Sequence, residues 1–179
     1  MARFPTFSLL FFLAAAANPA GAQTAQTFDR LLARAIELHQ AGDMLGAVDS
    51  SQAALAIYPD RADALSNLGA AYVRLGQYDD AIKQYEAALK ADGLNANIRL
   101  NLALAYYKSA RPNQAIPQLK RVVASEPEAK GAYLVLADCY LQTGQDKEVV
   151  ALLRPREQMF ERDLAYAFLL GTALLQMNE

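Results

Sequence analysis

The stretch NLGAAY at residues 67–72 decides the fold, because close copies of it recur at one fixed spacing. It returns as NLALAY at 101–106 and again, after an identical step, as VLADCY at 135–140. The same register extends backward to residues 34–38 and forward to residues 170–174. The period is therefore 34 residues, which is typical of an array of helical hairpins.

Small residues and helix breakers keep the same phase. A hairpin repeat needs small side chains where its two helices cross and a breaker where the second helix ends. The crossing positions hold Ala47, Ala81, Ala115 and Val149, the breakers are Pro59, Gly93 and Pro127, and the turns hold Gly42, Gly76 and Gly144 with Ala110 as the exception. Period, packing positions and breakers therefore agree with one another.

The block from Asn67 to Leu89 resembles a tetratricopeptide repeat, and the resemblance covers most of the chain from Phe28 onward. It implies an all-α fold, a right-handed α-solenoid of tandem helix-turn-helix repeats. We expect this array over residues 28–179, with repeats at about 28–61, 62–95, 96–129 and 130–163 and the first helix of a fifth at 164–179. Pentatricopeptide repeats have nearly the same period, but their RNA binding favours basic chains, and this one has 17 basic and 19 acidic residues.

Residues 1–22 predict a secretory signal peptide. Arg3 supplies a positive charge, residues 7–17 form an apolar run, and small residues at 20–22 offer a cleavage site. The run is shorter than the roughly 20 residues that cross a membrane, so an uncleaved anchor is the weaker alternative. Lipoprotein processing needs a cysteine where Gln23 stands. We expect a Sec-exported, periplasmic or secreted protein with residues 23–27 as a short linker and no stable membrane insertion after cleavage.

The chain offers little material for catalysis or metal binding. His39 is the only histidine and Cys139 the only cysteine, so neither a catalytic set nor a zinc site can be assembled from them. No glycine-rich phosphate loop is present, and the net charge of −2 argues against nucleic acid. We predict no enzyme activity, cofactor or metal, and we expect Cys139 to be a small buried side chain.

The resemblance implies that the first helices of the repeats line a concave groove that binds a protein or an extended peptide. Asn67 and Asn101, one repeat apart, are the candidates for holding the ligand backbone, because a carboxamide both donates and accepts hydrogen bonds. The alternative is that they make structural hydrogen bonds near the helix turn. Arg74 and Lys108 form a second repeated pair.

An apolar stretch is expected in the middle of the groove. Leu104 and Tyr107, with Leu100, suit a ligand with hydrophobic anchors, although Tyr107 can equally belong to the core. Family members that clamp a carboxylate of a chaperone use a lysine at the position that here holds Leu32, Ser66, Leu100 and Leu134. The carboxylate clamp is therefore not supported.

Three local features depart from a regular array. Pro117 predicts a kink or a shifted helix start, and Pro155 predicts a helix that ends near Arg154, followed by an irregular connection. Residues 164–175 form a first helix without a partner, so we expect that the native chain continues, that this helix docks on another chain, or that it caps the array poorly.

These observations predict an exported scaffold in envelope or secretion-related assembly. Two alternatives remain: the substrate-recruiting N-terminal part of a larger exported enzyme, and an architectural array that self-associates through residues 164–175.

Overall fold

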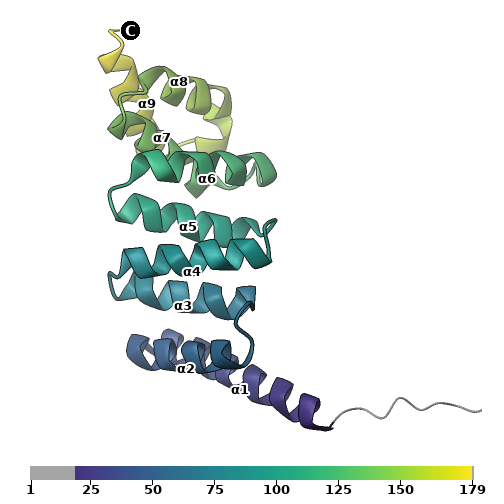
Figure 1. Ribbon diagram of the computed structural model, residues 1–179. Coiled ribbons are helices and arrows are strands. Elements are labelled where there is room, and N and C mark those ends of the chain that lie inside the picture. Colours follow the sequence, from purple (N-terminus) through teal and green to yellow (C-terminus); the bar gives the residue numbers. More distant parts are fainter. Residues whose placement is uncertain (1–18, 179) are drawn as a thin grey trace, which may run out of the picture.

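The computed structural model describes residues 19–178, and within them it contains nine α-helices, one 3-10 helix and no strand (Figure 1). The helices stack in successive antiparallel pairs along one direction (Figure 1). Their bounds are α1 Pro19–Ala41, α2 Met44–Ile57, α3 Ala62–Arg74, α4 Tyr78–Ala91, α5 Ala96–Lys108, α6 Pro112–Ser125, α7 Lys130–Gln142, α8 Asp146–Leu153, η1 Arg154–Phe160 and α9 Leu164–Gln176. The predicted all-α solenoid is confirmed.

Short polar side chains begin several of these helices. The carboxylate of Asp43 accepts a hydrogen bond from the Gly46 amide at 2.9 Å at the start of α2. Asn95 caps α5 and Asp163 caps α9 in the same way, each through the amide three residues later. Such caps satisfy amides that have no partner inside the helix.

The tight turn inside each hairpin needs a residue in the left-handed conformation. Gly42, Gly76 and Gly144 supply it with φ between 68° and 87°. Ala110 takes the same place between α5 and α6 with a φ of 58°, which strains a residue that carries a Cβ. The hairpin geometry thus overrides the preference of alanine.

Small residues sit where the paired helices cross. Ala47, Ala81, Ala115 and Val149 are all buried, as the period predicts. At Gly69 the second helix approaches closely, because an added Cβ would lie 2.9 Å from the ring of Tyr85. The crossings build a core cluster that extends from Leu65 to Ala173, with a smaller cluster around Phe28.

The first helices form one side of the array. Helices α1, α3, α5 and α7 each contact the next first helix, whereas each second helix from α2 to α6 packs between the first helix of its own repeat and that of the following one. Close packing of first helix on first helix makes theirs the inner side of the solenoid. We call the solvent-accessible positions of α3, α5 and α7 on this side the inner face.

Several expectations about the helix ends need correction. Residues 23–27 belong to α1 and are not a separate linker. Helix α6 starts at Pro112, one full repeat after the start of α4 at Tyr78, so Pro117 does not shift the start and lies inside the helix. By contrast, the expectation for α8 holds, because the helix ends at Leu153, beside Arg154. The connection that follows is irregular: its 3-10 turns over Arg154–Phe160 are interrupted at Arg156, whose φ of −115° and ψ of 17° are not helical, and Phe160 at their end is buried.

The predicted signal peptide lies mostly outside the described residues, and its last part, residues 19–22, forms the first turn of α1. Within residues 19–178 none of the helices has the length and apolar character needed to cross a membrane.

Candidate protein-binding face

The structure places all six predicted ligand-contacting residues on first helices. Asn67 and Arg74 lie on α3, and the remaining four lie on α5. Residues three or four positions apart on a helix share a face, so these side chains line up along the inner face. Arg74 and Lys108 are exposed. The other four are half-buried: Asn67, Asn101, Leu104 and Tyr107.

The side chains of Asn67 and Asn101 make no hydrogen bond within residues 19–178. Neither carboxamide has a hydrogen-bond partner in the part of the chain that the structure describes, and their atoms are not among the buried unpaired ones. The alternative that they are structural hydrogen-bonding residues therefore finds no support in residues 19–178. Both carboxamides remain available to a ligand.

Tyr107 is shared between the core and the inner face. Its ring packs against the main core cluster, and its hydroxyl donates a 2.6 Å hydrogen bond to Oδ2 of Asp138 on α7. Gln142, one helical turn beyond Asp138, donates to the same oxygen at 2.7 Å. The bond to Asp138 and burial raise the pKa of Tyr107 to about 12, so this hydroxyl stays protonated and keeps donating at neutral pH.

Asp138 is the inner-face residue that sequence reasoning missed. It stands one repeat after Leu104 and two repeats after Ala70, at a position that is apolar in both earlier repeats. The signal that could have identified it is an acidic residue at a repeat position that is apolar in the two preceding repeats. In the structure this carboxylate is half-buried, which costs free energy unless it has hydrogen-bond partners.

Arg74 and Lys108 lie in the last turn of α3 and α5, respectively. Neither forms an ion pair with another residue in the range 19–178. A cation in the last turn of a helix interacts favourably with the helix dipole, which accounts for both residues without a ligand. Their exposed position also allows them to contact an acidic group of a partner.

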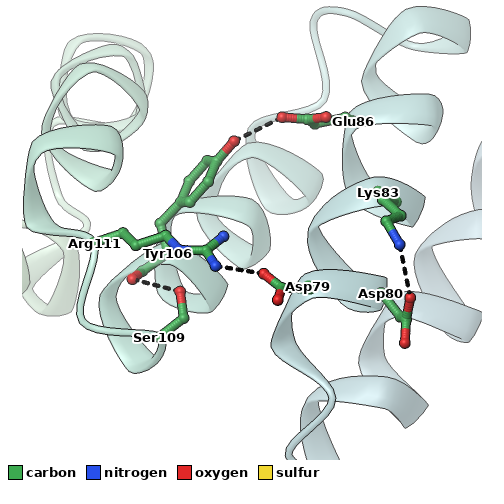
Figure 2. Close-up of polar contacts among 7 residues, drawn as sticks. All are labelled: Asp79, Asp80, Lys83, Glu86, Tyr106, Ser109 and Arg111. Atoms are coloured by element: carbon green, nitrogen blue, oxygen red, sulfur yellow. Dashed lines mark hydrogen bonds and ion pairs between the residues drawn. The ribbon is translucent and has the colours of Figure 1, made fainter.

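Polar contacts between repeats fix the spacing of the first helices. The hydroxyl of Tyr106 on α5 donates to Oε1 of Glu86 on α4 at 2.6 Å, and Arg111 pairs with Asp79 at 2.6 Å (Figure 2). One repeat earlier, Tyr72 occupies the same place as Tyr106 and accepts a hydrogen bond from Gln52. The contacts of Tyr106 and Arg111 hold the end of α5 against α4, and the contact of Tyr72 joins α3 to α2 in the preceding repeat.

Features outside the inner face include one open cavity, a buried cysteine and no metal-binding cluster among the described residues. An open cavity of about 640 Å³ lies away from the inner face, between η1 and the start of α9, where Phe160, Leu164 and Tyr166 contribute its apolar wall. Cys139 is buried as predicted, and burial raises the pKa of its thiol to about 11, which keeps it protonated and unreactive. Within the described residues no group of histidine, cysteine or carboxylate side chains is arranged to hold a metal ion.

Comparisons with known proteins agree with this architecture. Among curated proteins, tetratricopeptide repeat protein 8 of Caenorhabditis elegans is 23% identical over 116 residues, which are 64% of this chain and 23% of that protein. Intraflagellar transport protein 70B of Homo sapiens is 36% identical over 61 residues, or 34% of this chain and 9% of that protein. The chain thus spans less than a quarter of the length of these relatives.

Solved structures show the same fold at low identity. The MamA protein superposes with a TM-score of 0.80 at 20% identity, covering 86% of this chain and 84% of that one. YrrB gives a TM-score of 0.79 at 20% identity, covering 92% and 86%. The Pseudomonas aeruginosa protein pilF gives 0.70 at 20% identity, covering 87% and 71%.

A family model described as tetratricopeptide repeat matches residues 23–93 and again residues 60–125, and a second model of the same description matches residues 100–154. Together these matches span α2 to α8 in full and most of α1. With its constant repeat period, its small crossing residues and its stacked helix pairs, the chain belongs to the tetratricopeptide repeat family.

Proposed function

We propose that this chain is an exported, non-catalytic scaffold that holds an extended segment of a protein partner along its inner face. The observation that carries the proposal is the pair of carboxamides on Asn67 and Asn101, which lie one repeat apart and have no hydrogen-bond partner among the described residues. Each can accept from an N–H and donate to a C=O of the same extended backbone. The two carboxamides can therefore serve a partner without breaking a bond seen within residues 19–178.

The rest of the inner face suits the same ligand. Leu100 and Leu104 are half-buried and flank Asn101, so an apolar side chain of the partner can lose water against them. The face is built on helices held by a continuous core, so little ordering accompanies binding. In support, the structurally similar YrrB is described as a TPR protein with an unusual peptide-binding site.

Export is the second part of the proposal. Within α1, cleavage before Gln23 would remove only the first turn. Phe28, which is fully buried in the smaller core cluster, would stay in place. The family match also begins at residue 23. Expression of the full chain in a bacterium, followed by N-terminal sequencing, tests it. A periplasmic product that starts at Gln23 is expected, and an unprocessed cytoplasmic product would contradict export. We place the scaffold in envelope or secretion-related assembly.

Site-specific photo-crosslinking tests the binding face. A p-benzoylphenylalanine residue is introduced for Leu104 on the inner face or, as the matched control, for Leu45 on α2, which is 68% exposed. A partner captured from position 104 and lost when Asn67→Ala and Asn101→Ala are added supports the proposal, provided that circular dichroism shows an intact fold. Equal capture from both positions, or capture that survives the double substitution, contradicts it.

A second candidate function, self-association through α9, rests on an independent observation. Leu164, Phe168 and Leu175 are 86%, 69% and 77% exposed. At Gly171 an added Cβ would meet nothing within 4 Å, whereas the equivalent Gly69 lies against Tyr85. If copies associate here, the mass in sedimentation should rise with concentration, and Phe168→Glu should keep the chain monomeric. A monomer at every concentration removes this candidate.

A further inference from the structure

The carboxylate of Asp138 on α7 has no ion-pair partner within residues 19–178. Its Oδ2 accepts hydrogen bonds from two neutral donors, the hydroxyl of Tyr107 and the side-chain amide of Gln142. Its Oδ1 has no partner within residues 19–178 and is not among the atoms sealed from solvent. No lysine, arginine or histidine of the described chain lies within ion-pair distance of this carboxylate.

The repeat register shows what is missing beside it. The position of Gln142 is occupied by Arg74 two repeats earlier and by Lys108 one repeat earlier, and the residue four positions before those two is Ala70 or Leu104. A basic residue at 142 would pair with Asp138 in the favourable orientation, with the acid N-terminal to the base by four residues. The acid therefore enters the array at a repeat in which glutamine replaces the base, as Gln40 and Gln176 also do in the first and last repeats.

The apolar surroundings of Asp138 strengthen its interaction with a cation supplied by a partner. The side chain is half-buried, and Leu134 and Leu141 lie on its face of α7, one turn away on either side, also half-buried. A carboxylate that loses water next to apolar groups is stabilised strongly by an opposite charge that arrives with hydrogen-bond donors. Its electrostatic influence also reaches the neighbouring Cys139, whose pKa is raised by burial and then by this carboxylate.

We propose that Asp138 is the recognition site for a lysine or arginine side chain of the bound partner segment. The inference rests on the proposed function, because Asn67 and Asn101 hold the backbone from which this basic side chain projects. Tyr107 and Gln142 fix the carboxylate through Oδ2 and leave Oδ1 open to the incoming ammonium or guanidinium group. The preferred ligand is therefore an extended peptide with a basic residue next to apolar ones.

Selection from a phage-displayed library of random dodecapeptides on the full chain supplies the ligand. Peptides with a lysine or arginine at one aligned position, beside apolar residues, are expected. Replacement of that residue in the selected peptide by norleucine should weaken binding by about tenfold or more, the usual size for a lost charged hydrogen bond. Asp138→Asn, which keeps an acceptor for Tyr107, should weaken binding of the original peptide to the same degree.

A lysine at position 142 tests the charge without substituting Asp138. Gln142→Lys supplies an internal cation four residues after the acid and should weaken the basic peptide by about tenfold. The matched control is Gln176→Lys, the same substitution at the equivalent, exposed position of α9, where Thr172 stands four residues earlier, and it should leave the affinity within about threefold of wild type. Thermal melting confirms that each variant is folded. If Asp138→Asn does not fold, the two lysine substitutions still decide the question.

The outcomes separate the two proposals. Selected peptides without a basic position, or unchanged affinity in both Asp138→Asn and Gln142→Lys, overturn the cation site; the proposed function stands if Asn67→Ala with Asn101→Ala still abolishes binding. Peptides whose binding survives that double substitution overturn the proposed function. A library that yields no binding peptide overturns both.

Discussion

Gly69→Ala should destabilise the array although alanine is the better helix former. An ideal Cβ at residue 69 would lie 2.9, 3.0 and 3.1 Å from three ring atoms of Tyr85, all closer than the roughly 3.5–4.0 Å at which carbon atoms pack. The ring of Tyr85 is only 2% exposed, so it has little room to withdraw. The added methyl group must therefore push apart α3 and α4 or distort the ring.

The expected magnitude follows from two opposing terms. Overpacking of a tight core site costs about 1–3 kcal/mol. Removing a glycine from a helix interior contributes about 1 kcal/mol of stabilisation. The net effect of Gly69→Ala is thus a loss of roughly 0–2 kcal/mol. Gly171→Ala is the matched control, because its Cβ meets nothing within 4 Å, and it should gain about 1 kcal/mol.

Urea denaturation followed by far-ultraviolet circular dichroism measures the free energy of unfolding of both variants. The two should differ by about 1–3 kcal/mol. The double variant Gly69→Ala with Tyr85→Leu recreates the alanine and leucine that stand at the equivalent positions 103 and 119, so it should recover most of the loss. Equal stabilisation by Gly69→Ala and Gly171→Ala would refute the crossing contact and with it the phase of the repeats.

Three further substitutions test other features. Ala110→Gly should raise the free energy of unfolding by up to about 1 kcal/mol, because its φ of 58° strains alanine, and an unchanged urea midpoint would argue against that strain. Ser51→Ala should raise it by about 1 kcal/mol, because the fully buried hydroxyl has no partner; a lower melting temperature would reveal a hidden bond. The bond to Asp138 and burial raise the pKa of Tyr107 from 10.0 to about 12, so the stability it contributes is complete below pH 10 and is lost as the pH rises through 12. Tyr107→Phe should therefore make the alkaline decline in stability shallower, and identical curves for the two proteins would contradict this.

The repeat period predicted the core because each crossing pairs the same two repeat positions, one on each helix. Where the residue on the second helix is larger, the residue on the first helix is smaller. Ala103 and Ala137 stand where the second helix brings a leucine, and Gly69 stands where it brings the larger Tyr85. The same pairing of a small residue with a larger one recurs in each of these hairpins, so a single sequence shows the pattern several times. The buried positions could therefore be identified without a structure.

The helix ends are not encoded by the period. Helix α1 extends through residues 23–27, although the repeat register begins at Phe28, and within this extension Thr24 and Thr27 donate hydrogen bonds to carbonyls four residues earlier. After α8, which ends at Leu153 as expected, the chain makes 3-10 turns that are interrupted at Arg156. The ring of Phe160, stacked on that of Tyr166, accounts for this, since burying it fixes the path of the connection.

Two pairs of inner-face residues, Asn67 with Asn101 and Arg74 with Lys108, were predicted from their repetition, whereas Leu104 and Tyr107 were predicted as an apolar stretch that does not repeat. Tyr72 and Tyr106 each bond to the residue 20 positions earlier, so that contact belongs to the register. The bond from Tyr107 to Asp138 has no such counterpart, because the equivalent residues one repeat earlier are Val73 and Leu104. Residues that recur in every repeat are those that each hairpin needs for stacking on its neighbours. A residue that recognises one partner is needed in one repeat only. The position where the register changes from apolar to acidic is therefore the one at which we expect this array to differ in specificity from others of its fold.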